Sequence, residues 1–215
     1  MDFIGAYSMD HLLFLFDGLG MTLKLAFIAI VLSFAIGCLI GSIRYTRIPV
    51  LSQVLAFFVG TIRNLPLLLL IFFTRFGLPE LGISITPFWS AILALTVFEA
   101  AMISELVRSG LQSVDRGIVE AARASGLSHT QTLWHIILPI GVRRMVPPIV
   151  SQFISLLKDT SLVVIVSLAE LMHNAKIIMA DVNYVFPILL LLALIYFMVN
   201  YSLSQVARRL EITQH

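Results

Sequence analysis

Two oppositely charged residues, Lys158 and Asp159, stand side by side in an otherwise apolar part of the chain. If that part spans a membrane, the charges are costly and must face a cavity or a partner. A lysine and an aspartate that line a cavity can meet one anionic and one cationic group of a small ligand, and Thr160 and Ser161 behind them can add hydroxyls. The alternative is that Lys158 and Asp159 pair with neighbouring helices or with a dimer mate.

A second polar group, Arg63 and Asn64, precedes Pro66 within another apolar stretch. Because proline lacks a backbone N–H, a bend with freed carbonyls is expected there, and such irregular backbone is tolerated where it lines a cavity. These residues are therefore candidates for a pathway or a gate. Alternatively, Arg63 pairs with Glu99 or Glu105 to hold the helices together. Glu99 itself either lines the cavity or is that buried partner.

Catalytic and metal-binding patterns are missing from the sequence. The chain has no phosphate-binding G-x-x-x-x-G-K-[ST] loop, no G-x-S-x-G and no H-E-x-x-H. Its five histidines show no metal-ligand spacing. We expect no catalytic residue, no metal site and no bound cofactor in this chain.

The composition of the chain indicates a membrane protein. Of the 215 residues, 59% are hydrophobic and 12% charged, whereas a soluble domain has about 45–50% apolar and about 25% charged residues. One cysteine and eight prolines exclude a disulfide scaffold and a collagen-like repeat. A net charge of +2 is too small to indicate nucleic-acid binding. Uniformly apolar runs also exclude an outer-membrane barrel, whose strands would alternate.

The charge-free runs are long enough for helices to cross about 30 Å of hydrocarbon at about 1.5 Å per residue. We predict an all-α, polytopic fold with five transmembrane helices, the second interrupted before Pro66. The predicted spans are Thr22–Ile43, Leu51–Thr74, Pro87–Leu106, Val146–Ser167 and Tyr184–Val206. Within the first span, Gly37 and Gly41 form a close-packing motif that serves either a subunit contact or internal packing.

The basic residues predict the orientation, because cytoplasmic loops collect Lys and Arg. Nine of them fall on one side of the predicted spans, which puts the N-terminus outside and the C-terminus inside. They are Arg44, Arg47, Arg108, Arg116, Arg123, Arg143, Arg144, Arg208 and Arg209. Residues 2–20 mix apolar side chains with three aspartates and lack the basic start of a signal peptide. They are predicted to form a short helix on the outer membrane surface.

The long cytoplasmic connection between the third and fourth spans, residues 108–144, is predicted to hold two short helices. Asp115 can cap the first, and Gly126 suits the left-handed position that ends it. Ser128 and Gln131 form a capping box for the second, which runs to Pro139. We expect any partner inside the cell to meet the protein here.

This connection resembles the EAA loop of ABC-importer permeases. Seven residues have the spacing E-A-A-x3-G-x9-I-x-L-P, namely Glu120, Ala121, Ala122, Gly126, Ile136, Leu138 and Pro139. Four further segments are similar to polar amino-acid uptake permeases: Gly18–Lys24, Arg63–Leu68, Ser104–Val114 and Leu157–Leu162. The chain is thus identified as a member of that five-span family, over essentially its whole length.

The resemblance implies a single ABC-importer transmembrane domain, residues 1–215, with a coupling loop at about residues 115–139. The seven EAA-loop residues would contact a dimer of ABC ATPase subunits, which carries the ATP and Mg²⁺. Further implied partners are a second permease subunit in a homo- or heterodimer, an extracytoplasmic amino-acid-binding protein, an amino acid and membrane lipid. The implied location is the bacterial plasma membrane, where the chain is a transport subunit and not an enzyme.

Three alternatives stay open. A methionine-type ABC importer permease has a similar loop, and the segments at 63–68 and 157–162 favour polar amino acids over it. An intramembrane enzyme would need a nucleophile with a base or a carboxylate pair inside the spans, which the sequence lacks. Glu120 could also be a solvated helix charge without an ATPase contact.

Overall fold

The computed structural model describes residues 3–182 and 185–212, and every regular element in them is helical. The chain divides into two compact units, each built from three stretches of sequence. The first unit comprises residues 1–31, 66–96 and 153–206, and the second comprises residues 32–65, 97–152 and 207–215. Each unit is described on its own below.

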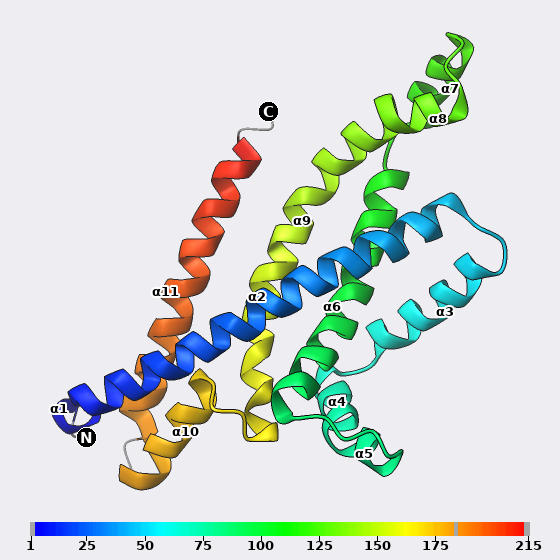
Figure 1. Cartoon of the computed structure of the whole chain (residues 1–215). Helices are drawn as coiled ribbons and strands as arrows, with labels where there is room; N and C mark the ends of the chain where they lie inside the picture. The colour runs from blue at the N-terminus through cyan, green and yellow to red at the C-terminus, as the bar shows by residue number, and fades with distance from the viewer. Residues whose placement is uncertain (1–2, 183–184, 213–215) are drawn as a thin grey trace. The chain divides into compact units, whose positions relative to one another are not determined.

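Four helical segments are long and apolar enough to cross a membrane, and a bent helix pair makes a fifth (Figure 1). The four are α2 (Met9–Thr46), α6 (Pro87–Gln112), the segment His129–Val166 and the part Val185–Gln205 of α11 (Val185–Ile212). The fold is therefore the predicted all-α, multi-span one. Tyr184, the predicted start of the last span, lies outside the described residues.

The predicted interruption of the second span is confirmed. Helix α3 ends at Asn64, and the next helix, α4 (Leu67–Phe72), starts only after Pro66; α3 spans Leu51–Asn64. Leu65, between them, has an extended backbone with φ −91° and ψ 143°. A proline disfavours the helical conformation in the residue before it, so Pro66 explains the break. A π-helical turn (Phe73–Gly77) and α5 (Leu78–Glu80) continue from α4.

The predicted surface helix over residues 2–20 is wrong for most of its length. Only α1 (Phe3–Ala6) is separate, and α2 starts at Met9 and continues for 38 residues. No proline interrupts it, and Asp10 lies in its first turn, where the positive end of the helix dipole favours an acidic side chain. The mixed composition of this stretch therefore reflects the start of a long helix.

The first unit is held by a cluster that joins the start of α2 to α10 (Leu171–Val182) and α11. Tyr7 also donates a 3.2 Å hydrogen bond to the Pro187 carbonyl. Helix α10 has no counterpart among the predicted spans, and it lies beside the start of α2 (Figure 1). The buried members of the cluster are Ala6, Leu15, Leu171, Ala175, Ile178, Ile188, Leu192 and Ile195.

The second unit contains a close contact between α2 and α6. A Cβ atom placed on Gly37 would lie 2.7 Å from the Ile103 Cβ, and one on Gly41 would lie 2.6 Å from the Ser104 carbonyl oxygen. Real Cβ atoms essentially never approach so closely. Of the two roles left open for this glycine pair, the contacts within the chain support internal packing.

The connection between α6 and α9 has the helix caps that the sequence predicts. Helix α7 (Arg116–Ala124) starts at Asp115, whose carboxylate accepts a 2.7 Å hydrogen bond from the Gly117 N–H. Gly126 has φ +89°. Both bonds of the capping box between Ser128 and Gln131 are present.

The predicted end of the second short helix is wrong, because the helix does not stop at Pro139. It continues from α8 (His129–Thr132) through a π-helical turn (Leu133–Ile137) into α9 (Leu138–Asp159) and a 3₁₀ segment (Thr160–Val166). In the π turn, the Leu138 N–H bonds to the Leu133 carbonyl, five residues back. This wider turn lies where a regular helix would press a carbonyl against the proline ring, so the helix passes Pro139 without ending.

Replacing Gly41 by leucine should destabilise the second unit by about 1–3 kcal/mol, because α2 must move away from α6. Gly60, in α3 of the same unit, has no atom within 4 Å of the position that a Cβ would take and is the matched control. We expect thermal unfolding of the purified chain in detergent to shift to lower temperature for Gly41→Leu and to change little for Gly60→Leu. Equal shifts would contradict the packing role of Gly41.

Candidate functional site

The EAA-loop residues form an exposed segment at α7 and the turn after it. Glu120, Ala121 and Gly126 are exposed and Ala122 is half-buried. Among the described residues, Glu120 forms no salt bridge. Small side chains beside an unpaired carboxylate leave room for another protein to approach closely and to supply a basic partner.

The surface around this segment has a hollow next to the turn. Five residues line it, with a volume of about 420 Å³: Ser125, Gly126, Leu127, Gln131 and His135. Nearby, Ile118 is 44% and Trp134 62% exposed. Exposed large apolar side chains beside a polar hollow are typical of an interaction surface. Trp134 lies within the motif spacing but at a variable position, so the motif did not single it out.

The later motif residues have a different setting from Glu120. Ile136 lies in the π turn and is half-buried, Leu138 is half-buried, and Pro139 is exposed. Farther along α9, Arg144 donates hydrogen bonds to the carbonyl and hydroxyl oxygens of Ser113. The long helix is thereby tied to the residues that follow α6, so a displacement of α7 and α8 can be transmitted along α9.

The polar residues of the predicted pathway belong to different units. Arg63, Asn64 and Glu99 lie in the second unit, whereas Pro66 and residues 158–161 lie in the first. Their grouping into one pathway therefore stays a prediction. Asn64 donates a 2.8 Å hydrogen bond to the Gly60 carbonyl one turn back, which satisfies that carbonyl just before the break.

Glu105 is the centre of an ion-pair cluster in the second unit. Its Oε2 lies 2.9 Å from Arg44 Nη2 and 3.6 Å from Arg63 Nη1, and its Oε1 accepts a hydrogen bond from Arg108. Glu99 and Glu105 were the two expected partners of Arg63, and the ion pair is formed with Glu105. The contact of Arg44 with this carboxylate was not predicted, because its spacing does not show which helices meet, whereas Glu105 and Arg108 form an i,i+3 pair on one helix.

Glu99 is fully buried in α6 and accepts a 3.0 Å hydrogen bond from the Gln152 amide of α9. A buried carboxylate is stable only with such partners. The contact links α6 to α9 in the second unit. Glu99 therefore has a place in internal packing, and a role in a pathway stays a prediction.

Lys158 and Asp159 end α9 in the first unit. Lys158 is exposed and Asp159 is half-buried, and among the described residues neither forms a salt bridge with another helix. Thr160 and Ser161 donate 2.7 Å hydrogen bonds to the carbonyls of Leu157 and Lys158. Their hydroxyls can therefore only accept further bonds, and a contact of any of these four residues with a ligand stays a prediction.

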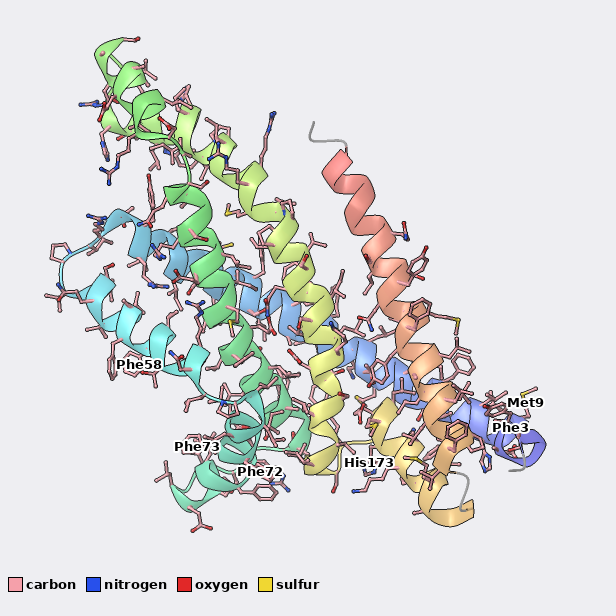
Figure 2. The ribbon with its side chains drawn as sticks, turned by 180° about the vertical axis from the view of Figure 1, so that it is seen from behind. Phe3, Met9, Phe58, Phe72, Phe73 and His173 are labelled. Carbon is pink, nitrogen blue, oxygen red and sulfur yellow. The ribbon has the colours of Figure 1, made fainter. Side chains whose placement is uncertain are left out.

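Glu170, in the first unit, is a buried carboxylate that the sequence did not predict. It caps α10 by accepting hydrogen bonds of 2.9 and 2.7 Å from the N–H groups of Met172 and His173. Thr22 of α2 donates to the same carboxylate at 3.4 Å and accepts from the Leu171 N–H at 3.1 Å. Figure 2 shows His173 in this first turn of α10. These hydrogen bonds around Glu170, called the Glu170 node below, tie α10 to α2.

Burial raises the pKa of Glu170 to about 7, and its hydrogen bonds only partly oppose this shift. Glutamate is an uncommon helix cap, and Thr22 is 148 residues away in the sequence, so no local sequence pattern indicates the Glu170 node.

Within residues 3–182 and 185–212, no group of three or more His, Cys, Asp or Glu side chains could hold a metal ion.

Comparison with known proteins relates the whole chain to one family. Residues 33–212 match the family described as "Binding-protein-dependent transport system inner membrane component". The chain is 64% identical, over its full length and that of the relative, to the "Probable glutamine ABC transporter permease protein GlnP" of Bacillus subtilis.

Two kinds of solved structure share the fold. One is described as "Crystal structure of an amino acid ABC transporter with histidines", with a TM-score of 0.94, 29% identity and 99% of each chain covered. The other is an inward-facing MetNI methionine ABC transporter, with a TM-score of 0.73 and 22% identity, covering 94% of this chain and 98% of that one. The second likeness shows the fold alone.

The Glu170 node predicts a stability that depends on pH. Because folding raises this pKa from 4.5 to about 7, folding favours the protonated carboxyl. That contribution is fully present below about pH 4.5 and is lost as the pH rises through about 7. We expect the melting temperature to fall between pH 5 and pH 8, and Glu170→Gln to flatten this part of the profile.

Glu80 is exposed in α5 and supplies the control, since Glu80→Gln should leave the profile as in the wild type. The measurement is the melting temperature of each purified variant in detergent across this pH range. An equal fall for wild type and Glu170→Gln would show that Glu170 is not the titrating group.

Proposed function

The chain belongs to the binding-protein-dependent transport system inner membrane component family, and from this premise we propose that it is the permease of an ATP-driven importer whose substrate is glutamine. The chain is a multi-pass protein of the bacterial plasma membrane and a transport component. The observation that carries the choice of substrate is the 64% identity, over the whole length of both chains, to a protein named as a probable glutamine permease.

ATP acts through a partner in this proposal. The sequence lacks a phosphate-binding loop, so a dimer of ABC ATPase subunits binds ATP and Mg²⁺. The exposed segment at Glu120, Ala121 and Gly126 docks on that ATPase, with the carboxylate of Glu120 facing a basic residue of the partner. The continuous helix from His129 to Val166 then carries the motion into the membrane.

A second permease subunit completes the pathway, because five spans from one chain enclose little space. It is either a second copy of this chain or a related permease. An extracytoplasmic binding protein delivers the amino acid to the outer side. Lys158 and Asp159 meet the carboxylate and the ammonium group of the substrate as it passes, which accounts for two charges at the end of α9 without a salt bridge to another helix in the described residues.

The substrate is tested by uptake of labelled glutamine into cells that depend on this chain for uptake, with unlabelled amino acids as competitors. We expect unlabelled glutamine to compete most strongly. Competition by methionine or arginine, with none by glutamine, would overturn the assignment while leaving the family unchanged.

Replacing Gly126 by valine should uncouple transport from ATP hydrolysis. A β-branched residue at φ +89° is strained by about 1–3 kcal/mol, so the turn after α7 would change shape while the spans insert normally. The measurement compares ATP hydrolysis with uptake in proteoliposomes. Gly60→Val, at a site with equally open space and no positive φ, is the control, and wild-type uptake per ATP by Gly126→Val would refute the coupling role.

Removing either charge at the end of α9 should weaken transport. A hydrogen bond to a charged group contributes about 1.5–3 kcal/mol, so Lys158→Ala and Asp159→Asn should each raise the apparent KM for uptake about tenfold or more. Lys176, an exposed lysine of α10, is the matched control. If both variants kept the affinity and rate of the wild type in proteoliposomes, these residues would not line the pathway.

A further inference from the structure

The ion-pair cluster around Glu105 carries more positive than negative charge. Arg44, Arg63 and Arg108 all point their guanidinium groups at this one carboxylate. Three positive charges and one negative charge leave an excess of two. Arg44 also donates to the Ser104 hydroxyl and Arg108 to the Gln112 side chain. Both of these acceptors are neutral, so among the described residues the excess positive charge has no second carboxylate to balance it.

Hydrogen-bond donors without partners in the cluster also indicate that it can bind an anion. The side chain of Arg44 is only 10% exposed. The Nε atoms of Arg44 and Arg108 are buried and have no hydrogen-bond partner among the described residues. A buried donor without a partner costs about 1–3 kcal/mol, so a rotation of either side chain that lets it donate to an anion would be favoured. Arg63, which is 40% exposed, is the side chain through which an anion would first reach the cluster.

An apolar groove lies next to the cluster, between α2, α3 and α6 of the same unit. It has a volume of about 130 Å³, and nine apolar residues line it: Ile36, Ile40, Leu55, Phe58, Val59, Ile62, Val97, Ala100 and Ala101. Ile62 directly precedes Arg63, and Ala101 is one helical turn before Glu105. An apolar cavity of about 150 Å³ stays dry and takes up hydrocarbon, so this groove suits an acyl chain.

We propose that the groove and the arginine cluster together bind an anionic phospholipid. The phosphate accepts from the exposed guanidinium of Arg63, Arg44 and Arg108 add positive charge beside it, and an acyl chain lies against Val59 and Ile62. Guanidinium groups pair well with phosphate oxygens, and basic pockets between spans on the cytoplasmic side bind anionic headgroups. The predicted orientation puts the end of α2 on that side.

The groove favours a lipid over another protein or a free ion. Phe58, which lines the groove, is 55% exposed, and it extends from the middle of α3 (Figure 2). Hydrocarbon covers such a side chain, whereas a free phosphate would leave it open. An acidic protein segment would place backbone polar groups against purely apolar walls.

The test is the thermal stability of the purified full-length chain in detergent with added phosphatidylglycerol, phosphatidylcholine or inorganic phosphate. We expect phosphatidylglycerol to raise the melting temperature by several degrees more than phosphatidylcholine, and inorganic phosphate to have little effect. Arg63→Gln should remove most of this difference between the lipids. Arg116→Gln removes a charge at an exposed position of α7 outside the Glu105 cluster and the residues that line this groove, so it should keep the difference.

A second variant tests the groove apart from the charges. Val59→Phe fills the apolar space and should reduce the phosphatidylglycerol effect while leaving the cluster in place. Equal stabilisation by both lipids, an equal loss with Arg116→Gln, or stabilisation by inorganic phosphate alone would each overturn the proposal. The readout is the difference between lipids in each variant, so a general loss of stability does not affect the interpretation.

Discussion

Charged side chains on membrane-spanning helices are costly because hydrocarbon offers neither water nor counterions to solvate them, so they need a partner in the protein or a cavity. Helix α6 shows this constraint most clearly. It is the most buried of the candidate spans and carries two carboxylates: Glu99 is paired with an amide of α9, and Glu105 with arginines of α2, α3 and α6. Without these contacts, both carboxylates would lose their partners, which would disfavour the packing of α6 against α2, α3 and α9.

The same constraint explains where the helices deviate from regular geometry. The break at Pro66, the π turn before Pro139 and the 3₁₀ segment after Asp159 all lie beside residues with a predicted functional role. Irregular backbone within a membrane needs protein or a water-filled cavity around it. These three deviations lie in segments that are predicted to line a pathway or to transmit motion, and a further π-helical turn, Phe73–Gly77, continues from α4.

Features encoded within one turn of helix were predictable from the sequence. The caps at Asp115 and Ser128, the glycine at 126 and the break at Pro66 depend on neighbouring residues, and all are present. Features that depend on distant contacts were not. Helix α10 is short and is held by Glu170 and Thr22, which are far apart in the chain, and the arginines meet at Glu105 only because three helices pack together. The roles of Lys158 and Asp159 in a pathway depend on a second subunit and stay predictions.

The central claim is that this chain forms a transport pathway driven by a separate ATPase. The most direct measurement is uptake of labelled glutamine by proteoliposomes that contain the chain with its ATPase, with binding protein outside and ATP inside. The account predicts accumulation that requires ATP and the ATPase, and none with the chain alone. Accumulation without the ATPase, or no accumulation of any amino acid by the complete assembly, would contradict it.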